Sequence, residues 1–200
     1  MSARRVPAAA ADDRPGRARP SAAVRGRPLS QVPCKVPRRH RRGGGRTPTM
    51  VTAAAVYAYA MRARIAPHLR ALGFQGSGQR YELPREKAWA QLGFQKSRGN
   101  TARSVRFTVN LSVIGKAAWE RAREEASWLP GRPNPNVHHG SRGEMVRIGL
   151  LLPSGSDVWW GFEAGEGSVE ELAEPCATDV CTAITDCAVP HLHRALAALP

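Results

Sequence analysis

The chain has 200 residues, which is long enough for one domain, or for one domain with a tail. Its formal net charge is +14, from 30 Lys and Arg against 16 Asp and Glu. No apolar run is long enough to cross a membrane, so we expect no membrane partner. Three of the 4 cysteines crowd near the C-terminus, which is no disulfide framework and favours a reducing, cytoplasmic setting.

The positive charge is concentrated in a leader, which we define as residues 1–49. The leader holds 13 of the 30 basic residues against two acidic ones, so it carries +11 and the rest of the chain +3. It is rich in Arg, Pro, Ala and Gly and has no aromatic residue, so it cannot bury enough surface to offset its chain entropy. We expect it to be disordered and to attract nucleic acid weakly and without specificity. An over-extended gene start in GC-rich DNA is an alternative origin of this composition.

Residues 50–200 hold every aromatic residue and are expected to form a single domain. The first expected element is a helix over Thr52–Leu72, whose apolar residues recur at helical spacing, with Gly73 ending it. Pro67 lacks the N–H of a helical hydrogen bond, so we expect a kink or break over Arg64–Pro67. Two strands should follow, over Gln79–Leu83 and Trp89–Lys96.

The clearest strand is expected over Ser104–Val113. Apolar and polar residues alternate strictly along it, which places one face in a core and the other toward water or a ligand. A helix over Lys116–Leu129 should follow, and a proline-rich loop then carries the chain to about Gly143.

The C-terminal part should add two strands, over Met145–Leu152 and Val158–Ala164, and then a helical region. A capping-box pattern at Ser168 opens that region, and Pro175 and Pro190 should divide it into two or three short helices. Short links between neighbouring strands favour an α+β fold, in which helices cover an antiparallel sheet of about five strands.

Five short segments carry a family resemblance when they are taken in order. They are Leu72-Gly-Phe74, Leu92-Gly-Phe-Gln-Lys-Ser97, Phe107-Thr-Val-Asn-Leu111, Arg147-Ile-Gly149 and Asp157-Val-Trp-Trp160. Together they resemble a bacterial family known as domain of unknown function 4304. The resemblance covers about Ala60 to Leu196 and leaves the leader outside. It implies an α+β domain and supplies no activity.

Polar side chains on or beside the strand over Ser104–Val113 form the first candidate binding site. They are Gln95, Lys96, Ser97, Arg106, Thr108, Asn110 and Arg147. Such a face can hold an anionic ligand or a partner's backbone through charge-assisted hydrogen bonds. The alternative is a solvated outer face, which is ordinary in antiparallel sheets. Asn110 is the most informative residue, because a buried amide needs neighbours that satisfy it.

Trp159 and Trp160 form the second candidate site. Consecutive residues of a strand point to opposite faces, so one tryptophan can fill the core while the other anchors an interface. The alternative is that helices cover both.

Catalytic and metal sites have little support in the sequence. The spacing of Cys176, Cys181 and Cys187 is not that of a usual zinc site, and the histidine pairs at 138–139 and 191/193 add no known pattern. No nucleophile elbow, Walker loop or dinucleotide fingerprint occurs. We therefore expect no metal and no cofactor, and the sequence leans away from an enzyme.

The leading interpretation is a non-catalytic binding module that presents the polar sheet face, or a groove beside a tryptophan, to another protein. One alternative is a small hydrolase-like enzyme that uses residues around Gln95–Ser97, Asn110 and Arg147. Another is a nucleic-acid accessory protein that acts through the basic leader.

Overall fold

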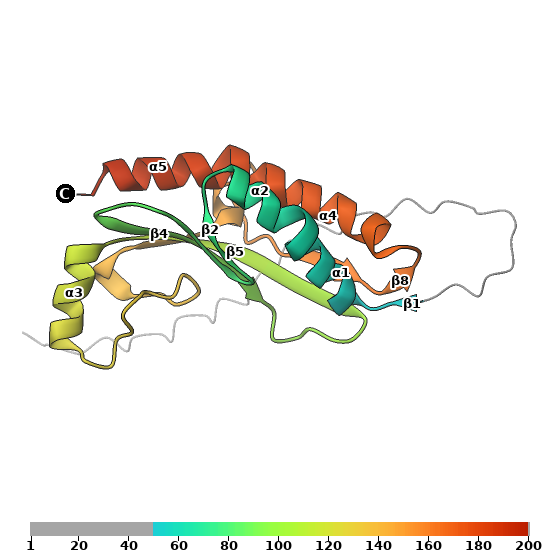
Figure 1. Ribbon diagram of the computed structural model, residues 1–200, viewed down its shortest axis with the longest axis horizontal. Coiled ribbons are helices and arrows are strands. Elements are labelled where there is room, and N and C mark those ends of the chain that lie inside the picture. The colour runs from blue at the N-terminus through green and yellow to red at the C-terminus, as the bar shows by residue number, and fades with distance from the viewer. Residues whose placement is uncertain (1–49, 200) are drawn as a thin grey trace, which may run out of the picture.

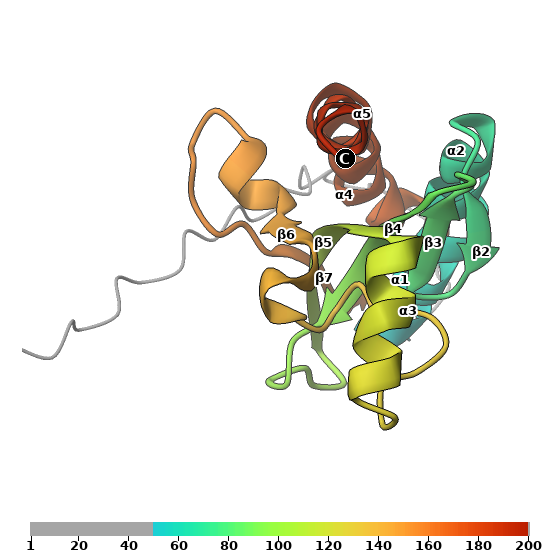
Figure 2. The ribbon, with the colours of Figure 1, turned by 90° about the vertical axis from the view of Figure 1, so that its left-hand side faces the viewer.

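The computed structural model describes residues 50–199, and the expectations for the leader lie outside that range. Two long helical runs lie on one face of a six-stranded antiparallel sheet, and a shorter helix lies on the other face (Figures 1 and 2). The expected α+β fold is confirmed. In residues 50–199, no helix is both long and apolar enough to cross a membrane.

The first helical run is continuous and passes through its proline without a break. It comprises α1 (Ala53–Tyr59), the π-helical turn η1 (Ala60–Ile65) and α2 (Ala66–Ala71). The N–H of Ala66 bonds to the carbonyl of Met61, five residues back, directly before Pro67. A π turn widens the helix, which gives the Pro67 ring room beside the preceding carbonyls. The distortion expected at Pro67 therefore takes the form of a π turn.

The C-terminal run is also continuous, so the prediction of two or three short helices is wrong. It comprises α4 (Val169–Ala183), the π turn η4 (Ile184–Ala188) and α5 (Val189–Ala197). Pro190 is accommodated like Pro67, because the N–H of Val189 bonds to the carbonyl of Ile184. Pro175 lies inside α4. The capping box is confirmed, with the Ser168 side chain and Glu171 bonding each other's backbone N–H.

The sheet contains all five expected strands and a sixth, β2, that was not predicted. Its order is β2-β3-β4-β5-β6, and β7 also pairs with β5. The strands are β2 (Gln75–Ser77), β3 (Arg80–Leu83), β4 (Ala88–Lys96), β5 (Ser104–Gly115), β6 (Glu144–Arg147) and β7 (Trp160–Glu163). A separate two-stranded sheet joins β1 (Met50–Val51) to β8 (Gly165–Glu166).

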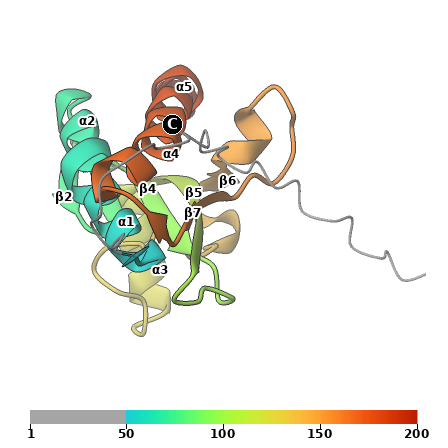
Figure 3. The same ribbon diagram turned by 90° about the vertical axis from the view of Figure 1, so that its right-hand side faces the viewer.

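Strands β6 and β7 are two halves of one interrupted edge strand. Residues 144–147 pair with β5 from Val113 back to Asn110, and residues 160–163 continue the pairing from Phe107 to Ser104. The residues between them, 148–159, project from the sheet edge and begin with the 3-10 turn η3 (Ile148–Leu151), as Figures 2 and 3 show. The strand expected over Met145–Leu152 is therefore wrong beyond Arg147.

The main core lies between the sheet and the two helical runs. Phe107 is at its centre, and its ring lies 5.4 Å from Tyr57, 5.9 Å from Phe162, 6.1 Å from Phe94 and 6.2 Å from Trp160, between centroids. A second, smaller core lies on the opposite face, under α3 (Lys116–Glu125). It consists of Ile114, Trp119, Ala122 and Leu129. The helix is shorter than the expected Lys116–Leu129, because it ends at Glu125 and residues 126–129 belong to a loop.

Candidate functional site

The polar face of β5 is buried by a loop that the sequence did not place there. We call residues 126–143, between α3 and β6, the covering loop. Gln95 lies opposite Thr108 in the register, and Asn110 is paired with Gly93 on one side and Arg147 on the other. Thr108 and Asn110 have no exposed surface. Asn110 lies under the covering loop and cannot contact a ligand unless that loop moves.

A three-residue amide network connects the sheet to the covering loop. The Asn110 Nδ2 group donates to Gln95 Oε1 and to Asn136 Oδ1, at 2.9 Å in each case. In a buried site these bonds are stronger than in water, and an amide that lost them would be costly. Asn110 is thus a residue that holds the covering loop.

The other polar residues of the first candidate site are dispersed. Lys96 points to the helical face of the sheet, where its Nζ lies 4.3 Å from the centre of the Tyr57 ring. Ser97 Oγ accepts a hydrogen bond from the Gly99 N–H within a turn, at 3.1 Å. Arg106 is exposed at the outer end of β5. The structure does not bring these three side chains together with Asn110.

Arg147 and Trp159 lie close together at the base of the projecting segment (residues 148–159), where its two ends meet the sheet. The Arg147 guanidinium donates to Asp157 Oδ2 at 2.6 Å, and Trp159 Nε1 donates to the same oxygen at 3.1 Å. The guanidinium carbon also lies 5.4 Å from the centre of the Trp159 ring. Asp157 therefore already compensates the charge of Arg147, and these contacts hold the two ends of the segment together.

Trp160 belongs to the core. It is 1% exposed, and its Nε1 donates to Asp179 Oδ2 on α4 at 2.6 Å, while Trp159 is half-buried on the opposite side of the chain. The indole N–H thereby finds the partner that a buried tryptophan needs. Trp160 fixes α4 over the sheet and is out of reach of a ligand.

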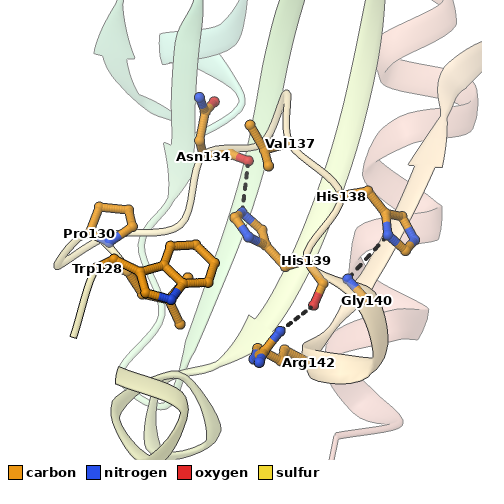
Figure 4. Close-up of a pocket in the computed structure, with 9 residues that line it drawn as sticks. Trp128, Pro130, Asn134, Val137, His138, His139, Gly140 and Arg142 are labelled. Carbon is orange, nitrogen blue, oxygen red and sulfur yellow. Dashed lines mark hydrogen bonds between the residues drawn. The ribbon is translucent and has the colours of Figure 1, made fainter. Parts of the chain in front are cut away.

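The most exposed large aromatic side chain lies on the covering loop. Trp128 is 78% exposed, and it lines a hollow of about 340 Å³. Figure 4 shows Trp128 and Pro130 along one side of this hollow, with His139 and Arg142 across from them. Val137, which is 46% exposed, adds another apolar side chain. We call this the Trp128 surface.

The covering loop is held firmly at several points behind the Trp128 surface. The Trp119 indole donates to the carbonyl of Pro130 at 3.0 Å, and its ring meets the His139 ring edge-on at 4.8 Å. His139 Nε2 lies 3.2 Å from the Asn134 carbonyl, to which it donates, and burial lowers the His139 pKa. The ring is therefore neutral at pH 7 and acts as a structural link.

Trp128 was missed because the sequence placed it in the helix over Lys116–Leu129. A signal was available: the apolar residues of that helix are Trp119, Ala122 and Ala126, and position 128 falls off their stripe. A tryptophan off the apolar stripe, directly before a proline-rich loop, is a candidate for exposure.

A second hollow, of about 530 Å³, lies between the two helical runs. Arg64 and Glu174 form an ion pair across the runs at 2.5 Å, and His68 Nε2 lies 2.9 Å from Thr185 Oγ1. Cys181 also lines this hollow, but burial raises the pKa of its thiol to about 11. A thiol that stays protonated at pH 7 is a poor nucleophile.

Cys181 should therefore react slowly with iodoacetamide at pH 8. Its thiolate is about 100-fold scarcer than that of an ordinary thiol, and the higher reactivity of such a thiolate recovers roughly tenfold. We expect labelling about tenfold slower than for a cysteine in a short peptide, measured by mass spectrometry of the fragment that contains Cys181. A rate equal to that of the peptide, in the folded chain, would contradict this assignment.

One histidine from each of the pairs at 138–139 and 191/193 has a partner within the protein. His191 Nε2 lies 2.7 Å from Glu144 Oε1, which ties α5 to β6. His138 Nδ1 accepts from the Gly140 N–H at 3.1 Å. In the part of the chain that the structure describes, no three His, Cys, Asp or Glu side chains are grouped closely enough to hold a metal ion.

The comparisons with known proteins give a family and no activity. No curated protein and no solved structure matches the chain. The sequence profile of the family described as Domain of unknown function (DUF4304) matches residues 65–194, from the end of η1 to α5. The match includes the sheet, the covering loop and the Trp128 surface, and the chain belongs to the DUF4304 family.

Proposed function

We propose that this chain is a non-catalytic protein-interaction module, and that it binds its partner through the Trp128 surface. The observation that carries the proposal is the 78% exposure of Trp128 beside an apolar hollow. Tryptophan is enriched among the residues that dominate binding energy, because it buries a large area and loses few rotamers.

The rigidity of the covering loop supports the same function. A binding surface that is fixed before association loses less conformational entropy on binding. Residues 126–143 are fixed to the sheet by the Asn110–Asn136 hydrogen bond and to α3 by Trp119. Of the polar residues expected to bind a partner, Asn110 bonds directly to the covering loop and Gln95 bonds to Asn110, so these two support the Trp128 surface from behind.

The chemistry of the two hollows favours binding over catalysis. The hollow beside Trp128 is lined by two histidines and Arg142, with no hydroxyl, thiol or carboxylate among its lining residues. The hollow between the helical runs contains Cys181, whose pKa is raised to about 11. The hollow beside Trp128 has no nucleophile. In the hollow between the helical runs, His68 lies 2.9 Å from the Thr185 hydroxyl, but within residues 50–199 no carboxylate is bonded to His68 to orient it, as covalent catalysis requires.

Photo-crosslinking from position 128 in cells of the source would test the proposal. A photoreactive residue at 128 identifies the partner, and the same residue at 150 serves as the control, since Leu150 is 54% exposed on the projecting segment. The purified partner is then titrated calorimetrically with the full chain and with the Trp128→Ala and Leu150→Ala variants.

We expect Trp128→Ala to weaken binding about 30-fold, as loss of a central aromatic anchor does, and Leu150→Ala to leave it within about twofold. Equal affinity of Trp128→Ala and the unsubstituted chain would overturn the proposal. Weakening by Leu150→Ala alone would move the interface to residues 148–159.

A further inference from the structure

The hollow beside Trp128 combines an apolar lining with a cation. Its apolar residues are Trp128, Leu129, Pro130 and Val137. Among the described residues that line it, Arg142 alone carries a permanent charge, and it lies across the hollow from Trp128 (Figure 4). A group that enters the hollow therefore meets an apolar surface and a guanidinium together.

The guanidinium of Arg142 has no acidic partner in the part of the chain that the structure describes. Its Nη1 group donates to the carbonyl of His139 at 3.4 Å, which is long for a hydrogen bond. Among the ion pairs of residues 50–199, none includes Arg142. Arg147 differs in this respect, because Asp157 compensates its charge at 2.6 Å. The charge of Arg142 is therefore available to a carboxylate from another molecule.

The covering loop as a whole is basic. Residues 126–143 contain two arginines and two histidines, and no aspartate or glutamate. The nearest carboxylates in the sequence lie outside the loop. Glu144 follows it and pairs with His191 at 2.7 Å, while Glu124 and Glu125 belong to α3 and are not lining residues of the hollow. Charge complementarity therefore favours a partner segment that carries carboxylates.

Resting on the proposed function, we propose that the segment bound by the Trp128 surface is an acidic peptide segment of the partner. One large apolar side chain enters the hollow, and an aspartate or glutamate beside it in the sequence bonds to Arg142. A guanidinium can hold a carboxylate through two parallel N–H···O bonds, which fix its orientation and strengthen the contact. Tryptophan and arginine are both enriched among the residues that dominate binding energy.

Selection from a phage library of random dodecapeptides tests this chemistry without a known partner. The full chain is the bait, and phage that also bind the Trp128→Ala variant are discarded. Because both chains carry the basic leader, this step removes peptides that are drawn to the leader alone. The remaining peptides should contain a large apolar residue with an aspartate or glutamate directly beside it or one position away.

The strongest selected peptide is then synthesised and titrated calorimetrically. Arg142→Gln should weaken its binding about tenfold, because a charge-assisted bond is lost. Arg62→Gln is the matched control, since Arg62 is exposed on η1 outside the hollow, and it should leave binding within about twofold. A peptide with amides in place of its carboxylates should bind the unsubstituted chain about tenfold more weakly, and Arg142→Gln should then cost little more.

The outcomes separate this inference from the proposed function. Selected peptides without aspartate or glutamate, or equal losses for Arg142→Gln and Arg62→Gln, would overturn the inference and leave the proposed function standing. If every binding peptide also bound Trp128→Ala, the proposed function would fail as well. Tighter Trp128-dependent binding of single-stranded oligothymidylate than of the peptide would assign the surface to nucleic acid and contradict both.

Discussion

Replacing Phe107 with alanine should lower the free energy of unfolding by about 3–5 kcal/mol, the usual range for an aromatic residue deleted from a core. Phe107 is fully buried, and its ring touches four other aromatic rings from α1, β4 and β7. A chain of this kind has a total stability of about 5–15 kcal/mol, so the variant would lose a large part of it. Urea unfolding followed by circular dichroism measures the change.

Phe107→Leu is the matched control, since it keeps most of the apolar volume and should cost about 1 kcal/mol. A loss of less than about 1 kcal/mol for Phe107→Ala would mean that the packing around β5 and the helical runs differs from the structure described here.

Replacing Asn110 with aspartate should destabilise the chain by about 3 kcal/mol or more at pH 7, although the two side chains have the same shape. The carboxylate cannot donate to Gln95 Oε1 or Asn136 Oδ1, and it would be buried against both oxygens. Burial raises the pKa of such a carboxyl above its unfolded value, so the protonated form is favoured in the folded state. Stability is then kept at low pH and lost as pH rises through the folded-state pKa.

The cost of Asn110→Asp should therefore be smaller at pH 5 than at pH 7, measured by urea unfolding against the unsubstituted chain at each pH. Thr108→Val is the control, because it removes an equally buried hydroxyl that has no partner to lose within residues 50–199. It should change stability by less than about 1 kcal/mol. Equal costs for Asn110→Asp at the two pH values would contradict the burial of this amide.

The fold could be predicted where the signals are local. The alternation along Ser104–Val113 lies within one strand, and β5 is found there with two further residues. The capping box at Ser168 is likewise contained in four residues. The prediction of a strand after Arg147 is wrong because the pattern of apolar residues cannot distinguish a buried strand from a short buried turn. The chain there forms η3.

The continuity of the two helical runs could not be predicted from the prolines. A proline removes a hydrogen bond, but whether the helix breaks depends on what the flanking turns gain by packing. In this fold both runs lie along the sheet, and π turns before Pro67 and Pro190 preserve that packing. The tertiary contacts decide the outcome, and they involve residues far apart in the sequence.

Only part of the candidate site could be predicted, because its cover also depends on contacts between residues far apart in the sequence. The polar face of β5 was recognised, but its cover comes from Asn136, which lies 26 residues beyond Asn110. Nothing local to β5 indicates that cover. Gly93 is the position that could have suggested it, because a glycine in the middle of a strand often marks close approach by another part of the chain.

Hydrogen exchange of the full chain, measured with and without the partner captured from position 128, shows which surface the partner covers. We expect slower exchange in residues 126–143 on binding, with little change in residues 148–159 and in the helices around the second hollow. Protection confined to residues 148–159 or to the two helical runs, with residues 126–143 unchanged, would contradict the claim that this chain binds through the Trp128 surface.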